Sequence, residues 1–174
     1  MSNKCPVNIT SFVKLALMLP EWKSILVRGV HGIGKSQIVS QIADKLRAER
    51  FNGEGFPLID QRLSQLTEGD IIGLPKMDED STRFQPADWY MKACKEPCCL
   101  FLDELNRATP EVMQAAFQIV LDRQLQGHKL HPQTRVYAAI NANASYIINE
   151  VDPALLDRFW AVDLEPTVDR KSVV

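Results

Sequence analysis

The sequence lacks the features that mark exported, membrane-spanning and general nucleic-acid-binding proteins. No apolar run approaches the roughly 20 residues that a membrane helix needs. The N-terminal stretch MSNKCPVNIT has no basic segment followed by an apolar one, so it does not resemble an export signal. The formal net charge of −2 argues against a strongly basic nucleic-acid binder, although it allows a local basic patch. We therefore expect a cytoplasmic protein with no membrane contact and no nucleic-acid partner.

Cysteine is scarce, and the chain has only four: Cys5, Cys94, Cys98 and Cys99. Cys98 and Cys99 lie in an apolar run, which indicates reduced thiols that pack as small hydrophobic groups. On paper, Cys94 and Cys98 could join His128 and His131 in a zinc site. The spacing fits the usual zinc sites poorly, because adjacent residues of a strand face opposite ways. We therefore expect no zinc.

Helical and strand patterns alternate along the chain, which is typical of an α/β domain with a parallel sheet. With 174 residues, 45% of them apolar and 24% charged, one domain with a substantial core is expected. Because the strand-like runs are continuously apolar, we expect a sheet covered on both faces. The five predicted strands are Ile25–Val27, Phe56–Ile59, Cys98–Leu102, Arg135–Ile140 and Trp160–Leu164.

Helices are predicted before the first strand and after the first and third strands. Ser11 would cap the first helix, Phe12–Leu19. In the second helix, Ile38, Ile42 and Leu46 recur at every fourth residue and form one face. The segment from 62 to 89, rich in glycine, proline and charge, fits this scheme least well, and we interpret it as a loop or hairpin that leaves the core.

Directly after the first strand comes GVHGIGKS, which matches the phosphate-loop pattern G-x-x-x-x-G-K-S in full. Its glycines let backbone N–H groups turn toward phosphate oxygens, and the next helix adds its positive N-terminal end. Lys35 would place a mobile ammonium on the outer phosphates, and Ser36 would offer its hydroxyl to Mg²⁺. The nucleotide-binding residues predicted from this motif are Gly29, Val30, His31, Gly32, Ile33, Gly34, Lys35 and Ser36.

An acid pair ends the third predicted strand, in the stretch CCLFLDELNRATPE. Ligands of open α/β sheets gather at the carboxyl ends of the strands, so Asp103 can hold the Mg²⁺, directly or through water. Glu104 points elsewhere and can orient and deprotonate the water that attacks the outer phosphate. The alternative is a strand that simply runs out into solvent with two acids at its tip. Pairing with the phosphate loop favours the catalytic interpretation.

Four segments stand in a fixed order along the chain: GVHGIGKS, LFLDELNRATPEVMQAAFQIVLDRQL, RVYAAINAN and VDPALLDRF. Together they resemble the ATPase core of the AAA+ superfamily, and within it they most resemble the MoxR-type branch. The resemblance runs from about Ile25 to Leu164. It implies a P-loop three-layer sandwich with a five-stranded parallel sheet and the hydrolysis of ATP with Mg²⁺. It also implies a homo-oligomeric ring, expected to be a hexamer, that remodels a partner protein such as a von Willebrand-type domain protein.

The resemblance assigns roles to further residues. Asn141, after the fourth apolar strand, matches the first sensor, which helps to position the attacking water, and Asn143 is its rival. Arg158, in LDRF, matches the arginine finger, which completes the site of a neighbouring subunit, and a permanently charged guanidinium suits transition-state phosphate charge. Arg123 is a further residue that could face a neighbour.

The family's core is normally followed by a small helical lid, whereas this sequence ends at Val174, soon after the fifth strand. We therefore expect residues 1–174 to form the core, with 62–89 as an insert after the second strand and no C-terminal lid. Two other functions stay open. The missing lid favours a nucleotide-responsive scaffold that does not hydrolyse ATP, although Glu104 and Asn141 argue against it. A nucleic-acid motor is disfavoured by the acidic charge balance.

Overall fold

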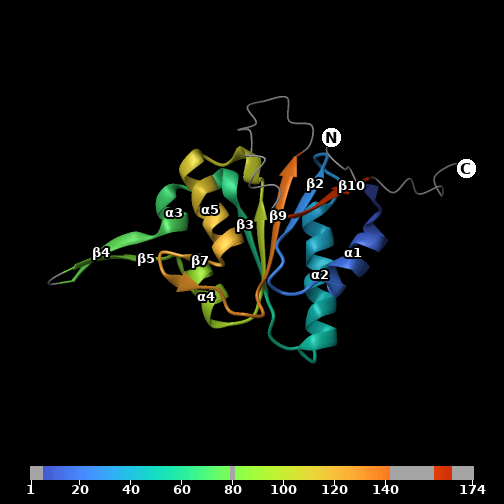
Figure 1. Ribbon diagram of the computed structural model, residues 1–174, viewed down its shortest axis with the longest axis horizontal. Helices are drawn as coiled ribbons and strands as arrows, with labels where there is room; N and C mark the ends of the chain where they lie inside the picture. Colours follow the sequence, from blue (N-terminus) through green and yellow to red (C-terminus); the bar gives the residue numbers. More distant parts are fainter. Residues whose placement is uncertain (1–5, 79–80, 142–158, 166–174) are drawn as a thin grey trace, which may run out of the picture.

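The computed structural model describes residues 6–78, 81–141 and 159–165, and a parallel β-sheet forms its centre (Figure 1). The strand order is β1-β10-β2-β9-β6-β3, and every neighbouring pair in it is parallel. The expected five-stranded parallel sheet is confirmed, and a strand of two residues is added at one edge. The strands are β1 (Pro6–Val7), β2 (Ile25–Gly29), β3 (Leu58–Arg62), β6 (Cys99–Asp103), β9 (Arg135–Asn141) and β10 (Trp160–Leu164).

Helices cover both faces of the sheet, which confirms the three-layer arrangement (Figure 1). Helices α1 (Ile9–Met18) and α2 (Lys35–Arg50) cover one face. The other face carries α3 (Glu68–Ile72), α4 (Asp88–Lys95) and α5 (Pro110–Asp122). Successive residues from Cys99 to Leu102 in β6 are buried on opposite sides of the sheet, so this part of the strand is apolar, as expected for a sheet with two covered faces.

Several element boundaries differ by one to three residues from the sequence prediction, and two of these differences have a clear physical cause. Helix α1 is capped by Asn8 rather than Ser11, since the Asn8 Oδ1 atom accepts a 2.8 Å hydrogen bond from the Ser11 backbone N–H. Asparagine and serine are comparable N-caps, so composition alone could not choose between them. Strand β3 begins at Leu58 rather than Phe56, because Phe56 has φ 50°, which is not an extended conformation, and packs into the core from the segment before the strand.

The segment from 62 to 89 is only partly an excursion from the core. Its outer part is the antiparallel hairpin of β4 (Leu74–Asp78) and β5 (Ser81–Gln85), which projects away from the body of the domain in Figure 1. Its inner part, however, is core: Leu63 and Ile71 are fully buried against the face that α5 covers. The interpretation as a hairpin is therefore right, and the interpretation as a segment outside the core is wrong for these apolar positions.

The adjacent cysteines pack as the strand pattern predicts. Cys98 and Cys99 are both buried, and they belong to the clusters on opposite faces of the sheet. Within the described ranges, no three His, Cys, Asp or Glu side chains gather where they could hold a metal ion. The expected lack of zinc stays a prediction, because Cys5 lies outside these ranges. None of the helices described is long and apolar enough to cross a bilayer.

Candidate active site

The polar residues predicted from the motifs meet at the carboxyl ends of three adjacent strands. Strand β9 lies between β2 and β6, and Gly29 at the end of β2 pairs with Asn141 at the end of β9. A cavity of about 290 Å³ opens at this edge of the sheet. Among its lining residues are Lys35, Ser36, Asp103, Glu104 and Asn141, all predicted as site residues, together with Arg62, which was not.

The phosphate loop owes its shape to two glycines with positive φ. Gly32 has φ 81° and Gly34 has φ 86°, which L side chains rarely adopt. Gly34 immediately precedes α2, so Lys35 and Ser36 are the first residues of that helix. A Cβ atom on Gly32 would meet no atom within 4 Å, so the loop borders open space there. This geometry provides a concave backbone and a helix N-terminus, which together suit an anion such as a phosphate group.

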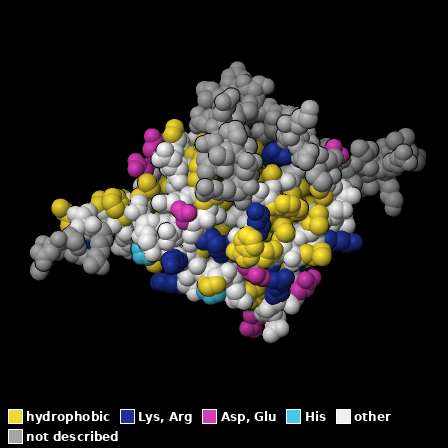
Figure 2. Space-filling view, viewed as in Figure 1, with side chains coloured by type: hydrophobic (Ala, Val, Ile, Leu, Met, Phe, Trp, Pro, Cys, Tyr) yellow, Lys and Arg dark blue, Asp and Glu magenta, His cyan; other side chains and the backbone are white. Residues whose placement is uncertain are grey.

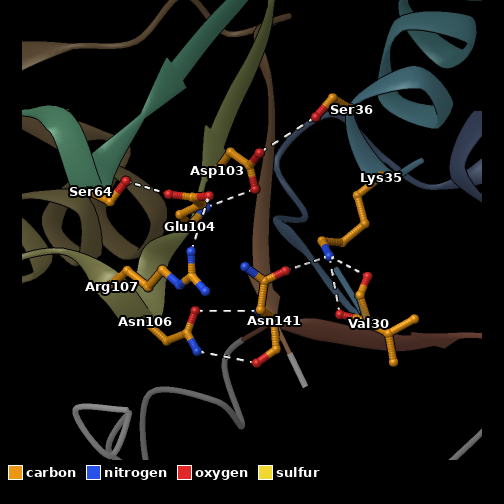
Figure 3. A network of polar contacts seen from close by, with 10 residues as sticks. Val30, Lys35, Ser36, Ser64, Asp103, Glu104, Asn106, Arg107 and Asn141 are labelled. Atoms are coloured by element: carbon orange, nitrogen blue, oxygen red, sulfur yellow. Dashed lines mark hydrogen bonds and ion pairs between the residues drawn. The ribbon is translucent and has the colours of Figure 1, made fainter. Parts of the chain in front are cut away.

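Lys35 points from the start of α2 across the cavity toward the end of β9 (Figure 3). Its side chain is only 7% exposed. The Nζ atom donates to Asn141 Oδ1 at 2.7 Å, to the Val30 carbonyl at 3.0 Å and to the Gly29 carbonyl at 3.1 Å. Three neutral oxygen acceptors therefore hold the ammonium, and each is a partner that a phosphate group can replace.

Burial lowers the pKa of the Lys35 ammonium below its ordinary value. The carboxylates of Asp103 and Glu104 oppose this shift, and the guanidinium of Arg107 adds to it to a smaller degree. The lysine is thus a cation whose charge is poorly compensated by its present acceptors. A phosphate ligand would favour the protonated form and restore that compensation.

Ser36 and Asp103 form an oxygen pair on the other side of the cavity. The Ser36 Oγ and Asp103 Oδ2 atoms are 3.5 Å apart, and Asp103 Oδ1 accepts a 2.8 Å hydrogen bond from the Glu104 backbone N–H. A hydroxyl and a carboxylate are hard oxygen ligands of the kind that Mg²⁺ takes beside nucleotide phosphates. The residues present therefore fit a magnesium site of few protein ligands.

The backbone turns away from the direction of β6 at Glu104. The φ of 56° at this residue lies in the left-handed region, and Glu104 immediately precedes the short 3₁₀ helix η2 (Leu105–Arg107). Its carboxylate accepts a hydrogen bond from the Ser64 hydroxyl, and it lies 3.7 Å from the Arg107 guanidinium (Figure 3). The Glu104 side chain is 14% exposed. It thus borders the same cavity as Asp103 and has a different set of partners.

Asn106 is a site residue that the sequence reasoning missed. Its amide Nδ2 donates to the Asn141 carbonyl at 3.3 Å, and its Oδ1 accepts from the Asn141 backbone N–H at 3.3 Å. The residue is 2% exposed. The Asn106 side chain, in the turn after β6, therefore holds the backbone of Asn141 at the end of β9. This contact fixes the direction in which the Asn141 side chain leaves the sheet.

Three further residues were predicted to act at the site or to face a neighbouring subunit. Arg158 and Asn143 lie outside the described residues. Arg123 does not support the suggestion that it faces a neighbour, because its guanidinium donates to three backbone carbonyls of its own chain, those of Glu21, His131 and Thr134.

Comparison with known families and structures agrees with this geometry. Residues 24–159 match the AAA domain of the dynein-related subfamily. The chain belongs to this AAA family. The AAA+ core expected from the motifs is therefore confirmed, and proteins of this family bind ATP, generally together with Mg²⁺.

The AAA domain is similar to parts of much larger proteins. It is 32% identical over 110 residues to midasin from Giardia intestinalis, a match that covers 63% of this chain and 2% of midasin. A protein from Cytophaga hutchinsonii described as an ATPase has a TM-score of 0.62 at 18% identity, over 90% of this chain and 46% of that one. The Hsp104–ADP complex from S. cerevisiae has a TM-score of 0.56 at 16% sequence identity. The match covers 88% of this chain and 25% of the Hsp104 chain. These two structures share the fold, and this chain spans less than half of each.

Proposed function

We propose that this AAA domain hydrolyses ATP with Mg²⁺ as part of a MoxR-type machine. It would act as a homo-oligomeric ring, expected to be a hexamer, that remodels a partner protein, and a von Willebrand-type domain protein is the candidate partner. The observation that carries the proposal is the convergence of Lys35, Ser36, Asp103, Glu104 and Asn141 on one cavity. A site that only bound nucleotide would need the first three, whereas Glu104 and Asn141 are the groups that chemistry on a water molecule requires.

Binding follows from the groups at the start of α2. The loop Gly29–Ser36 would surround the phosphates with backbone N–H groups, and Lys35 would exchange its three present acceptors for phosphate oxygens. Ser36 and Asp103 would hold Mg²⁺, which neutralises phosphate charge when it is bound.

Hydrolysis follows from the groups at the ends of β6 and β9. Glu104 would accept a proton from the attacking water, while Ser64 and Arg107 hold its carboxylate in place. When Lys35 turns to the phosphates, the Asn141 amide is released to hydrogen-bond that water. Arg158 of a neighbouring subunit would stabilise the charge that develops on the transferred phosphoryl group.

Two substitutions separate binding from hydrolysis. Lys35→Ala should abolish ATP binding, because the phosphates lose their cation, whereas Glu104→Gln should keep binding and lower the rate of phosphate release by about a hundredfold or more. Binding is measured by titration calorimetry and turnover by phosphate release. The matched controls are Lys45→Ala and Glu49→Gln, which change exposed residues of α2 and should change neither quantity.

Each outcome decides between the proposed ATPase and its alternative. Equal loss of binding in the Lys35 and Glu104 variants would remove the role given to Glu104. If the unchanged chain binds ATP, releases no phosphate and still assembles, the non-hydrolysing scaffold is the better description. DNA binding that weakens with salt would instead favour a nucleic-acid motor.

A further inference from the structure

A second cavity lies away from the candidate active site, between the β4–β5 hairpin and helix α4. Its volume is about 500 Å³, and we call it the hairpin groove. Phe84, Pro86 and Met91 supply its apolar surface. Phe84 is 44% exposed, which is unusual for an aromatic side chain that already has neighbours.

The apolar surface continues along the hairpin. The strand register places Pro75 opposite Phe84 and Met77 opposite Thr82, so these four side chains share one face of the hairpin. Met77 is 86% exposed. Figure 2 shows this band of hydrophobic side chains on the projecting hairpin, with Lys, Arg and His side chains gathered beneath its base. Exposed apolar area of this kind marks an interaction surface.

The groove is bordered by cationic side chains. Lys76 and Lys95 line it together with His128, and Asp88 is the one acid of its lining in the described part of the chain. Neither lysine forms an ion pair with any described residue. Counting Lys76 and Lys95 against Asp88, the lining of the groove carries one net positive charge, although the whole chain carries a net charge of −2.

Helix α4, which forms one wall of the groove, is tied to the segment that carries His128. The Tyr90 hydroxyl of α4 donates to the His128 carbonyl at 2.8 Å, and the His131 N–H donates to the Ala93 carbonyl of α4 at 3.0 Å. These bonds join α4 to the small hairpin of β7 (Gln124–Leu125) and β8 (His128–Lys129). A ligand would therefore meet a preformed α4 wall and would lose little free energy in ordering that side of the groove.

From these observations, we propose that the hairpin groove docks an acidic segment of a partner protein, with an apolar side chain of that segment seated against Phe84 and Met91. Carboxylates of the segment would pair with Lys76 and Lys95, because these ammonium groups have no described ionic partner. The groove would supply the partner contact that the proposed function requires. Docking itself needs no nucleotide, so the two proposals can fail separately.

A nucleic acid fits the groove less well than an acidic peptide. A single strand is held by a basic path that follows the phosphates over several nucleotides, with aromatic rings for the bases. Here two lysines flank a short apolar floor, and Asp88 would repel a phosphate. The charge and size match a few carboxylates around one apolar anchor.

The test uses fluorescence anisotropy of the full chain without nucleotide. The probe is a fluorescein-labelled peptide, SEEFEEFEES, and the comparison peptides are SKKFKKFKKS and SEESEESEES. Lys76→Glu combined with Lys95→Glu should weaken probe binding by about tenfold, and so should raising the salt from about 0.05 to about 0.5 M. Phe84→Ser should reduce the preference for the probe over SEESEESEES.

The control variants make the same charge reversal and the same kind of apolar-to-polar change elsewhere on the surface. Lys14→Glu combined with Lys45→Glu reverses two exposed lysines elsewhere, and Met18→Ser removes another exposed apolar side chain. Both controls should leave binding unchanged, and thermal unfolding checks that every variant folds. Equal binding of the three peptides, or equal loss in variants and controls, overturns the proposal. Tighter binding of a labelled oligothymidylate that the Lys76 and Lys95 changes abolish would assign the groove to nucleic acid instead.

Discussion

Asn106 joins two strand ends that the proposed chemistry needs to keep in register. Its reciprocal hydrogen bonds to the Asn141 backbone link the turn after β6, which carries Glu104, to the end of β9. Glu104 and Asn141 would act on the same water molecule, so a small shift of one against the other would misplace both. The buried Asn106 amide thereby holds the motif at the end of β6 and the motif at the end of β9 together in one site.

Replacing Asn106 by alanine tests this positioning role. Asn106→Ala leaves the buried Asn141 N–H and C=O without their partners, so we expect the free energy of unfolding to fall by about 1–3 kcal/mol. It should also lower kcat for ATP hydrolysis at least tenfold, roughly the effect of losing one well-placed group, while KM changes little. Urea unfolding and phosphate release measure the two effects.

The control for Asn106→Ala is Ile119→Val, a change at a buried residue of α5 that does not line the site cavity, which costs about 0.5–1.5 kcal/mol. It should leave kcat unchanged. If both variants lower kcat in proportion to the stability that they lose, Asn106 is a structural residue only.

At the scale of elements, the β4–β5 hairpin is anchored at its base by one glycine. Gly73 has φ 95° and ψ −179°, a region that is open essentially to glycine alone. A Cβ atom there would lie 2.0 Å from the Gln85 carbonyl oxygen. The next nearest atoms, the Gln85 carbonyl carbon and the Pro86 Cα, are also backbone, so a side chain at this position must open the first pair of the hairpin.

Gly73→Ala should therefore destabilise the hairpin by more than the conformational cost alone. Gly53→Ala is the matched control, because Gly53 has φ 82° but no atom within 4 Å of its added Cβ. The control should cost about 1–2 kcal/mol, and the Gly73 change should cost more. Hydrogen exchange should show the excess as lost protection in β4 and β5. Equal effects would mean that the contact with Gln85 adds nothing.

At the scale of the whole molecule, ring assembly is tested through Arg158. If the residue acts on a neighbour's site, Arg158→Ala alone should bind ATP normally and hydrolyse it about a thousandfold more slowly. The Lys35→Ala chain should also be inactive alone, yet it keeps Arg158. A mixture of the two should recover part of the phosphate release, because some interfaces then join an intact arginine to an intact loop.

Recovery is meaningful only in mixtures that light scattering shows to co-assemble. The control mixes Arg158→Ala with Glu104→Gln, where again some interfaces join an intact arginine to an intact pocket, so it should recover activity too. Co-assembled mixtures with no activity in either case would show that Arg158 does not act in trans.

The local chemistry of the site could be read from the sequence because it depends on neighbours in the chain. The loop Gly29–Ser36 needs its glycines and its following helix, and Asp103 with Glu104 needs only a buried strand before it. The strands were found for the same reason, since burial on both faces makes them continuously apolar. The start of a helix was missed where two residues are comparable N-caps, as Asn8 and Ser11 are for α1.

Tertiary structure alone decided which residues support the motifs. Ser64 reaches Glu104 across 40 positions, and Asn106 reaches Asn141 across 35. These contacts exist because β3 and β9 flank β6 in the sheet, and strand order leaves no trace in a local hydrophobic pattern. The hairpin groove has the same origin: Phe84 and His128 line one cavity only because the chain between them folds back through α4 and α5.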